Sequence, residues 1–374
     1  MVTGFSLRTR ILVYACLISG LLYSSKSFSM IPDSTQDNST RNLTISYFHG
    51  YLYPHHRLVT YFNTEYINGF DLAISSHVPA LNHLHPPEIG GGYYFSNLGS
   101  REVYGYAHSL YFFVGRDYFQ CKLPVYLQQS IGTGVSFNTK HFDISENYSN
   151  RLIGSHLNIF FIYTLNLKAR FGERMLFSIG PAFVHTSNGN ISQPNFGLNL
   201  ISTRMSLTYT MDRDGKKSVV PIHYLPDFNK NRYLIVVAGG VRELSHRIPK
   251  YFTVGSIMTD YTRRLDANLA LGLGMDFIYD PTEGMPLYVI GAQVENIIPW
   301  HIGTHLSYER IWNHFSLVIN SGYKIITPSE HYNRQYNRVG IRYRFNNHFV
   351  LNYSLKSHKF VADFLEFGVG YIIE

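Results

Sequence analysis

Apolar and polar residues alternate along much of this chain. Between positions 175 and 184, one parity carries bulky apolar residues and the other mostly small ones: Met175, Phe177, Ile179, Pro181 and Phe183 against Leu176, Ser178, Gly180, Ala182 and Val184. Successive side chains of a β-strand point to opposite faces. The pattern therefore predicts a strand with one bulky, apolar face. Residues 269–277, 341–345 and 365–373 repeat it, with charges and glycines gathered on the second face.

Strand-like segments follow one another to the last residue, with turn sequences such as Asn68-Gly69 and Asp280-Pro281 between them. No stretch of helical period has a useful length, and no compositional linker divides the chain. The longest segment without strand character, residues 212–231, is polar and is expected to be a loop at either end of a barrel. Strands are predicted to begin near Leu43, Asn68, Ile89, Tyr104, Gln120, Leu152, Met175, Leu198, Arg232, Lys250, Ala267, Leu287, His301, Phe315, Asn337, Phe349 and Ala362.

The composition favours a membrane barrel. Charged residues make up 15% and aromatic residues 16% of the chain, while the mean hydropathy is only −0.09. A transmembrane strand needs an apolar residue only at every second position, whereas a transmembrane helix needs about 18 or more in a row. A soluble sandwich would show the same alternation. The long unbroken series of strands favours a closed barrel, which leaves no exposed sheet edge.

We therefore predict an all-β fold: an antiparallel transmembrane outer-membrane β-barrel of about 16 strands, with 12 to 16 tolerable, because bacterial barrels prefer even numbers. Residues 42–374 are expected to form this single barrel. Residues 1–29 fit a secretory signal peptide, with Arg8 and Arg10 ahead of a short apolar core, and residues 30–41 form a flexible lead. A retained anchor helix is the alternative for the first segment. Export to the outer membrane of a Gram-negative cell follows from this assignment.

The net charge of +7 does not indicate nucleic acid. Lysines and arginines are scattered, and a phosphate-rich lipid surface explains a mild positive balance equally well. Cys121 is the one cysteine left after the signal peptide, so no intrachain disulfide is expected. His83 and His85 with Glu88 match no recognised zinc spacing, and we expect neither a metal nor an organic cofactor.

The strand from Met175 ends in His185-Thr186-Ser187-Asn188-Gly189. Its parity puts His185 and Ser187 on the bulky apolar face, side by side at an i, i+2 spacing. A base and a hydroxyl on a lipid-facing surface suit a hydrolase whose substrate is embedded in lipid. By itself, His-x-Ser is a weak motif, since Asn-Gly is an ordinary hairpin turn and rim histidines are common in barrels.

The continuation Gln193-Pro194-Asn195-Phe196-Gly197 makes the motif more specific. Together the two stretches resemble the signature of the lipid A 3-O-deacylases of the PagL type, His-x-Ser-Asn followed by Pro-Asn-x-Gly. The resemblance covers residues 58–212, and we take the remainder as extra strands that widen the same barrel. It implies a small antiparallel barrel with a Ser-His-Glu triad on its outer wall, and hydrolysis of the ester at position 3 of lipid A.

The resemblance assigns roles to individual residues. Ser187 matches the nucleophile and His185 the general base, while Asn188 and the backbone amides of Gly189 and Asn190 are candidates for the oxyanion site. Asn195 and Gly197 match the second half of the signature. The family's glutamate is replaced by Asn199, whose parity places it on the same face. An amide accepts from the imidazole N–H but carries no charge, so we expect a working but slower enzyme, with complete loss of activity as the alternative.

The leading hypothesis is an outer-membrane esterase that removes an acyl chain from lipid A or lipopolysaccharide by a Ser-His mechanism. A non-enzymatic porin or channel with a vestigial site is the alternative, because about 16 strands would leave room for a lumen. A phospholipase or acyltransferase using the same serine is a third possibility. Asn147, Asn150 and Ser155 form a polar turn ahead of a predicted strand and are expected to border the site.

Overall fold

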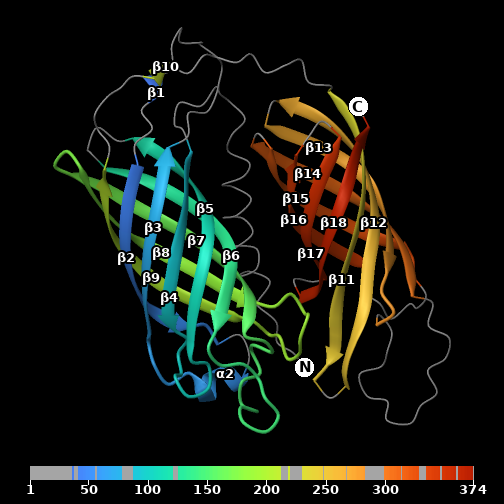
Figure 1. Cartoon of the computed structure of the whole chain (residues 1–374), viewed down its shortest axis with the longest axis horizontal. Coiled ribbons are helices and arrows are strands. Elements are labelled where there is room, and N and C mark those ends of the chain that lie inside the picture. Colours follow the sequence, from blue (N-terminus) through green and yellow to red (C-terminus); the bar gives the residue numbers. More distant parts are fainter. Residues whose placement is uncertain are drawn as a thin grey trace. The chain divides into compact units, whose positions relative to one another are not determined.

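The computed structural model contains two closed antiparallel barrels of eight strands each, β2–β9 and β11–β18 (Figure 1). The all-β barrel class and the total of sixteen barrel strands are confirmed. The expectation of one wide barrel over residues 42–374 is wrong. The structure describes residues 36–37, 41–54, 57–77, 87–120, 125–211, 218–219, 230–246, 248–266, 268–282, 299–312, 314–327, 334–345, 348–358 and 361–373.

The first barrel closes by pairing its first strand with its last. Leu52 of β2 pairs with Leu200 of β9, and Asn42 with Thr210, so the sheet is complete before residue 212. The short helix α2 (Arg57–Phe62), which the sequence pattern did not predict, follows β2. The strands are β2 (Arg41–Leu52), β3 (Ile67–His77), β4 (Glu88–Asn97), β5 (Tyr106–Gln120), β6 (Val125–Asn138), β7 (Leu157–Phe171), β8 (Met175–Ser187) and β9 (Leu198–Thr210).

The second barrel closes in the same way, between β11 and β18, with Tyr233 opposite Ile373. Its strands are β11 (Asn231–Ser245), β12 (Ile248–Asp266), β13 (Leu269–Tyr279), β14 (Trp300–Trp312), β15 (Phe315–Ile326), β16 (Gln335–Arg344), β17 (Phe349–His358) and β18 (Val361–Ile373). Within the described ranges, no helix has the length and apolar character to cross a membrane.

Among the described residues, two short strands lie outside the barrels. β1 (Gln36–Asp37) pairs with β10 (Ser218–Val219). β10 belongs to the polar segment 212–231, which therefore connects one barrel to the next and is not a loop within a single wall. The predicted signal peptide, His83 and His85, and the extra strand expected near Leu287 lie outside the described residues.

Each barrel exposes apolar side chains on its outer surface. Phe112 of β5 is 78% exposed, and Phe367 of β18 is 63% exposed. Inside the first barrel, the rings of Phe48 and Phe160 lie 5.1 and 5.3 Å from that of Tyr94. An exterior of large apolar residues around a filled interior is the arrangement that a barrel in a lipid bilayer requires.

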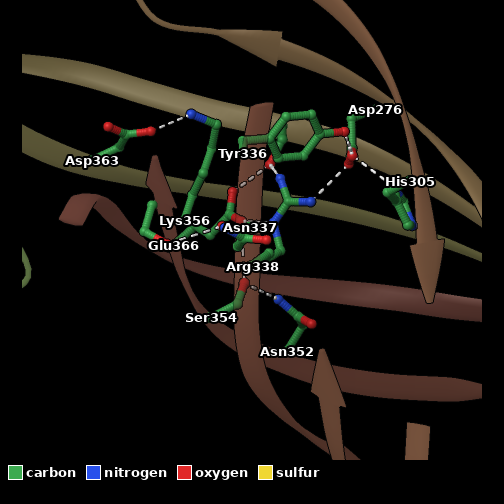
Figure 2. A network of polar contacts seen from close by, with 12 residues as sticks. Asp276, His305, Tyr336, Asn337, Arg338, Asn352, Ser354, Lys356, Asp363 and Glu366 are labelled. Atoms are coloured by element: carbon green, nitrogen blue, oxygen red, sulfur yellow. Dashed lines mark hydrogen bonds and ion pairs between the residues drawn. The ribbon is translucent and has the colours of Figure 1, made fainter. Parts of the chain in front are cut away.

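The second barrel has a polar interior (Figure 2). Arg338 donates from Nη1 to Oδ1 of Asp276 at 2.8 Å and from Nε to Glu366. His305 contacts two carboxylates at once, with Nδ1 2.7 Å from Asp276 and Nε2 2.7 Å from Asp260. These charges come from different strands and are fully or nearly fully buried, so the network links strands across the lumen.

Candidate active site

The candidate site lies where β8 ends and β9 begins. His185 stands directly opposite Asn199 in the antiparallel register of these strands. On β8, Phe177 and Ile179 share the parity of His185 and are 44% and 39% exposed, while the intervening Ser178 is buried. On β9, the residues that share the parity of Asn199 are likewise more exposed than those between them. His185, Ser187 and Asn199 therefore occupy outward-facing positions of their strands.

Hydrogen bonds join these three side chains in a row. The Nδ1 atom of His185 lies 2.7 Å from Oδ1 of Asn199, and its Nε2 atom lies 3.0 Å from Oγ of Ser187. The amide oxygen can only accept, so Nδ1 carries the proton and Nε2 presents its lone pair to the serine hydroxyl. Ser187 is 8% exposed, and the other two residues are half-buried. The arrangement is suited to removing a proton from Ser187.

Gly197 supports the imidazole ring. Its φ of 75° lies in the left-handed region, and a Cβ atom at this position would lie 2.7 Å from Cε1 of His185. Its backbone N–H donates to the carbonyl oxygen of Leu152 at 2.9 Å. A glycine is required here because the ring packs where any larger side chain would begin.

The loop between β6 and β7, residues 139–156, borders the site. Asn188 donates from Nδ2 to Oγ of Ser155 at 3.0 Å, and Ser155 donates to the carbonyl oxygen of Leu157 at 2.9 Å. Asn150 is fully buried and shapes this loop, since its Oδ1 accepts from the backbone of Leu152 and its Nδ2 donates to that of Val103. The polar turn in the sequence indicated that this loop borders the site. It did not indicate that Ser155 is the residue that contacts Asn188.

The remaining predicted support residues lie on the connection between β8 and β9. Gly189 and Asn190 both have positive φ values, 64° and 73°, and turn the chain immediately after Asn188. Asn195 is half-buried and lies two residues before Gly197. The described residues contain no group of three or more histidine, cysteine, aspartate or glutamate side chains arranged to hold a metal ion.

Two family models match the chain, one on each barrel. Residues 68–208 match the model described as lipid A 3-O-deacylase (PagL), and residues 231–374 match that described as acyloxyacyl hydrolase, C-terminal domain. Each barrel is thus similar to a domain of the PagL-type hydrolases, and each match covers less than half of the chain. These matches support an outer-membrane acyl hydrolase. The second match covers the strands of the second barrel, which close separately from those of the first.

The three solved structures compared below share little sequence identity with this chain. The outer membrane enzyme PagL is 18% identical, covers 44% of this chain and 97% of its own, and has a TM-score of 0.31. An outer membrane channel from Pseudomonas putida is 8% identical, with 92% and 99% covered and a TM-score of 0.23. The ferric enterobactin receptor mutant R480A from Pseudomonas aeruginosa is 9% identical, with 86% and 45% covered and a TM-score of 0.23. No curated protein matches the sequence. At these scores the structural likenesses carry no argument about activity.

Proposed function

We propose that this protein is an outer-membrane esterase of the PagL type that removes an ester-linked acyl chain from lipid A, with Ser187 as its nucleophile. The observation that carries the proposal is the hydrogen-bonded row from Asn199 through His185 to Ser187. An activating base and a residue that orients the base are what a serine hydroxyl needs to attack an ester. The family match supports acyl hydrolysis independently of this geometry.

The reaction proceeds in two steps. Oγ of Ser187 attacks the ester carbonyl carbon while its proton passes to Nε2 of His185, and the carbonyl oxygen becomes an oxyanion. Collapse of this intermediate breaks the bond to the sugar oxygen, which takes the proton from His185 and leaves as an alcohol. Water then attacks the acyl-serine with the same base, releasing the fatty acid and restoring Ser187. Asn199 holds the imidazole in the required tautomer throughout.

Stabilisation of the oxyanion falls to groups next to Ser187. The side-chain amide of Asn188 and the backbone N–H of Gly189 are the donors proposed here, with Asn195 as a support for the turn that carries them. The hydrogen bond from Asn188 to Ser155 fixes the rotation of that amide before substrate binds. Donors that are already oriented lose no free energy to reorganisation when the oxyanion forms.

The outward phase of the site suits a substrate held in the membrane. Exposed Phe177 and Ile179 lie on the same face as His185 and would contact acyl chains. The connections at the site end, residues 53–66, 98–105, 139–156 and 188–197, are longer on average than those at the other end, residues 78–87, 121–124 and 172–174. Long loops mark the extracellular end of such barrels. Lipid A in the outer leaflet would therefore meet Ser187 directly.

A channel function is less well supported. An eight-stranded barrel has an interior just wide enough for side chains. In the first barrel, Lys168 and Glu88 form a buried ion pair at 3.1 Å within the lumen. In the second, the pairs of Arg338 with Asp276 and Arg342 with Asp260 cross it. These contacts disfavour a continuous aqueous pore through either barrel.

The test is expression in a lipopolysaccharide-bearing host, followed by mass spectrometry of lipid A. Wild type should remove one acyl chain, and Ser187→Ala and His185→Ala should each abolish the change. Thr203→Ala is the matched control, because Thr203 is an exposed polar residue on the outer face of β9. Unchanged lipid A with wild type, together with conductance in planar bilayers, would favour the channel. Transfer of the acyl chain to another lipid would instead indicate an acyltransferase.

A further inference from the structure

A basic cavity lies inside one end of the second barrel, and no residue assigned to the candidate active site is among those that line it. It is formed where β12, β14 and β16 end and β11 and β15 begin. Among the described residues that line it, Glu309 is the only carboxylate. The lining comprises Arg232, Arg264, Arg342, Arg344 and His314, together with Glu309, Ser316 and the apolar residues Leu234, Ile311, Phe315, Val350 and Ile372.

Arg342 is the most deeply buried of these cations, at 2% exposed. Its Nη2 atom donates to Oδ2 of Asp260 at 2.7 Å, and its Nε atom donates to Oδ1 of Asn352 at 3.2 Å. Its Nη1 atom is buried and has no hydrogen-bond partner among the described residues. Two nitrogen atoms of the guanidinium thus have hydrogen-bond acceptors in the barrel, and Nη1 has none among the described residues.

Arg232 repeats this arrangement. It is 6% exposed, and its Nη2 atom donates to Glu309, whereas its buried Nε atom has no partner within the described part of the chain. Glu309 also accepts a hydrogen bond from Ser316 at 2.6 Å. Glu309 and Asp260 are therefore already engaged, and the residues that line the cavity carry more positive than negative charge.

Both features indicate an anionic ligand with several oxygen atoms. A buried donor without an acceptor destabilises the fold, and so does a surplus of cations in a region of low dielectric constant. Guanidinium groups bind phosphate oxygens with matched, often bidentate geometry. We propose that this cavity binds a phosphate group, which bridges Arg232 and Arg342 inside and meets Arg344 at the mouth.

The position of the cavity suggests two sources for such a group. At this end, the connections after β12, β14 and β16 are short, which is typical of the periplasmic side. Aromatic pairs mark the outer surface here, with Phe315 and Tyr343 at 4.8 Å and Phe349 and Tyr371 at 5.3 Å. Aromatic side chains gather at the level of lipid headgroups. The phosphate could belong to a phospholipid headgroup of the inner leaflet or be free in the periplasm.

Titration calorimetry on the full-length protein in a non-ionic detergent tests the proposal. One arm uses inorganic phosphate, and the other uses short-chain phosphatidylglycerol, with short-chain diacylglycerol as the probe that lacks phosphate. Arg342→Gln and Arg344→Gln are the test variants. Among the described residues, no hydrogen bond or ion pair of the Arg344 side chain is seen, so Arg344→Gln is the safer variant if loss of Arg342 prevents folding. Arg263→Gln is the matched control, because Arg263 is exposed and directly precedes the cavity residue Arg264 on β12.

We expect wild type to bind phosphate in at least one arm, and each test variant to weaken it by about tenfold, as expected for loss of a charge-assisted hydrogen bond. Arg263→Gln should bind like wild type, and so should Ser187→Ala, which separates this site from the esterase. Binding of inorganic phosphate alone would assign a free anion, and binding of the phospholipid alone would assign a headgroup. Absence of binding in both arms, or binding that neither variant weakens, would overturn the proposal.

Discussion

The imidazole Nδ1 of His185 lies 2.7 Å from the side-chain oxygen of Asn199, the residue directly opposite it in the register of β8 and β9. Directly opposed residues in an antiparallel pair bring their Cβ atoms to about 5 Å, so the strands themselves set this contact. The orienting position is therefore held by the barrel wall and needs no loop. The residue there nevertheless differs from the glutamate that the family signature leads one to expect.

The first prediction concerns that difference. Asn199→Asp keeps the shape of the side chain and places a carboxylate at the same distance from Nδ1, where it would stabilise the imidazolium that forms during attack. We expect the rate of acyl release to rise about tenfold or more, and Asn199→Glu to raise it too. Asn199→Ala should lower the rate, because the tautomer is no longer fixed. Fatty acid released from lipid A in mixed micelles is the measurement. A drop with both acidic variants would contradict this account of Asn199.

The second prediction concerns Gly197. Gly197→Ala would press its Cβ against Cε1 of His185 and move the ring away from Ser187. We expect acyl release to fall by about tenfold or more, since a misplacement of roughly 1 Å can cost up to about a hundredfold in rate. Gly172→Ala is the matched control: Gly172 has a similar φ of 68°, but no atom lies within 4 Å of its added Cβ. Equal activity losses in the two variants would mean that backbone strain, and not the contact with His185, is responsible.

The third prediction concerns Ser155 as a positioning residue. Ser155→Ala removes the acceptor that holds the Asn188 amide. Loss of one hydrogen bond of about 1 kcal/mol should lower kcat about fivefold and leave KM nearly unchanged. On an Asn188→Ala background the same substitution should have little further effect, because the two residues act through one bond. Ser145→Ala, in the same loop, is the control. Additive losses in the double variant would show that Ser155 acts otherwise.

Much of the fold could be read from local pattern. Strands were expected to begin at Met175, Leu198, Phe315 and Phe349, and those are the first residues of β8, β9, β15 and β17. Period-two alternation identifies strands and their two faces because both depend on neighbouring residues. The same parity indicated that His185, Ser187 and Asn199 share one face, which is how their side chains lie. Their catalytic roles stay predictions.

Closure of the barrels could not be read in this way. It depends on β9 pairing with β2, about 150 residues earlier, and the alternation of β9 is the same whether its neighbour is β2 or β11. The strand expected at Leu152 was wrong for a different reason. There Asn150 binds the backbone N–H groups of Leu152 and Ile153 and holds them in a loop, so β7 begins only at Leu157. The contact between Ser155 and Asn188 was hidden by the same error.

The last prediction concerns the stability of the second barrel. Both ring nitrogens of His305 contact carboxylates at 2.7 Å, so both donate and the ring carries a positive charge between Asp260 and Asp276. His305→Ala would leave two buried carboxylates without this cation. Breaking such a buried network by removing one partner typically costs about 3–5 kcal/mol.

Because no strand of one barrel pairs with a strand of the other among the described residues, we expect this loss to be confined to residues 231–374. Limited proteolysis during urea titration, with fragments assigned by mass spectrometry, should show the C-terminal barrel of His305→Ala opening at lower urea while the N-terminal barrel is unaffected. Thr304→Ala is the matched control, since Thr304 is the exposed neighbour of His305 on β14. If both barrels of His305→Ala open together at lower urea, the two domains unfold as one cooperative unit, and the independence inferred from their separate closure is wrong.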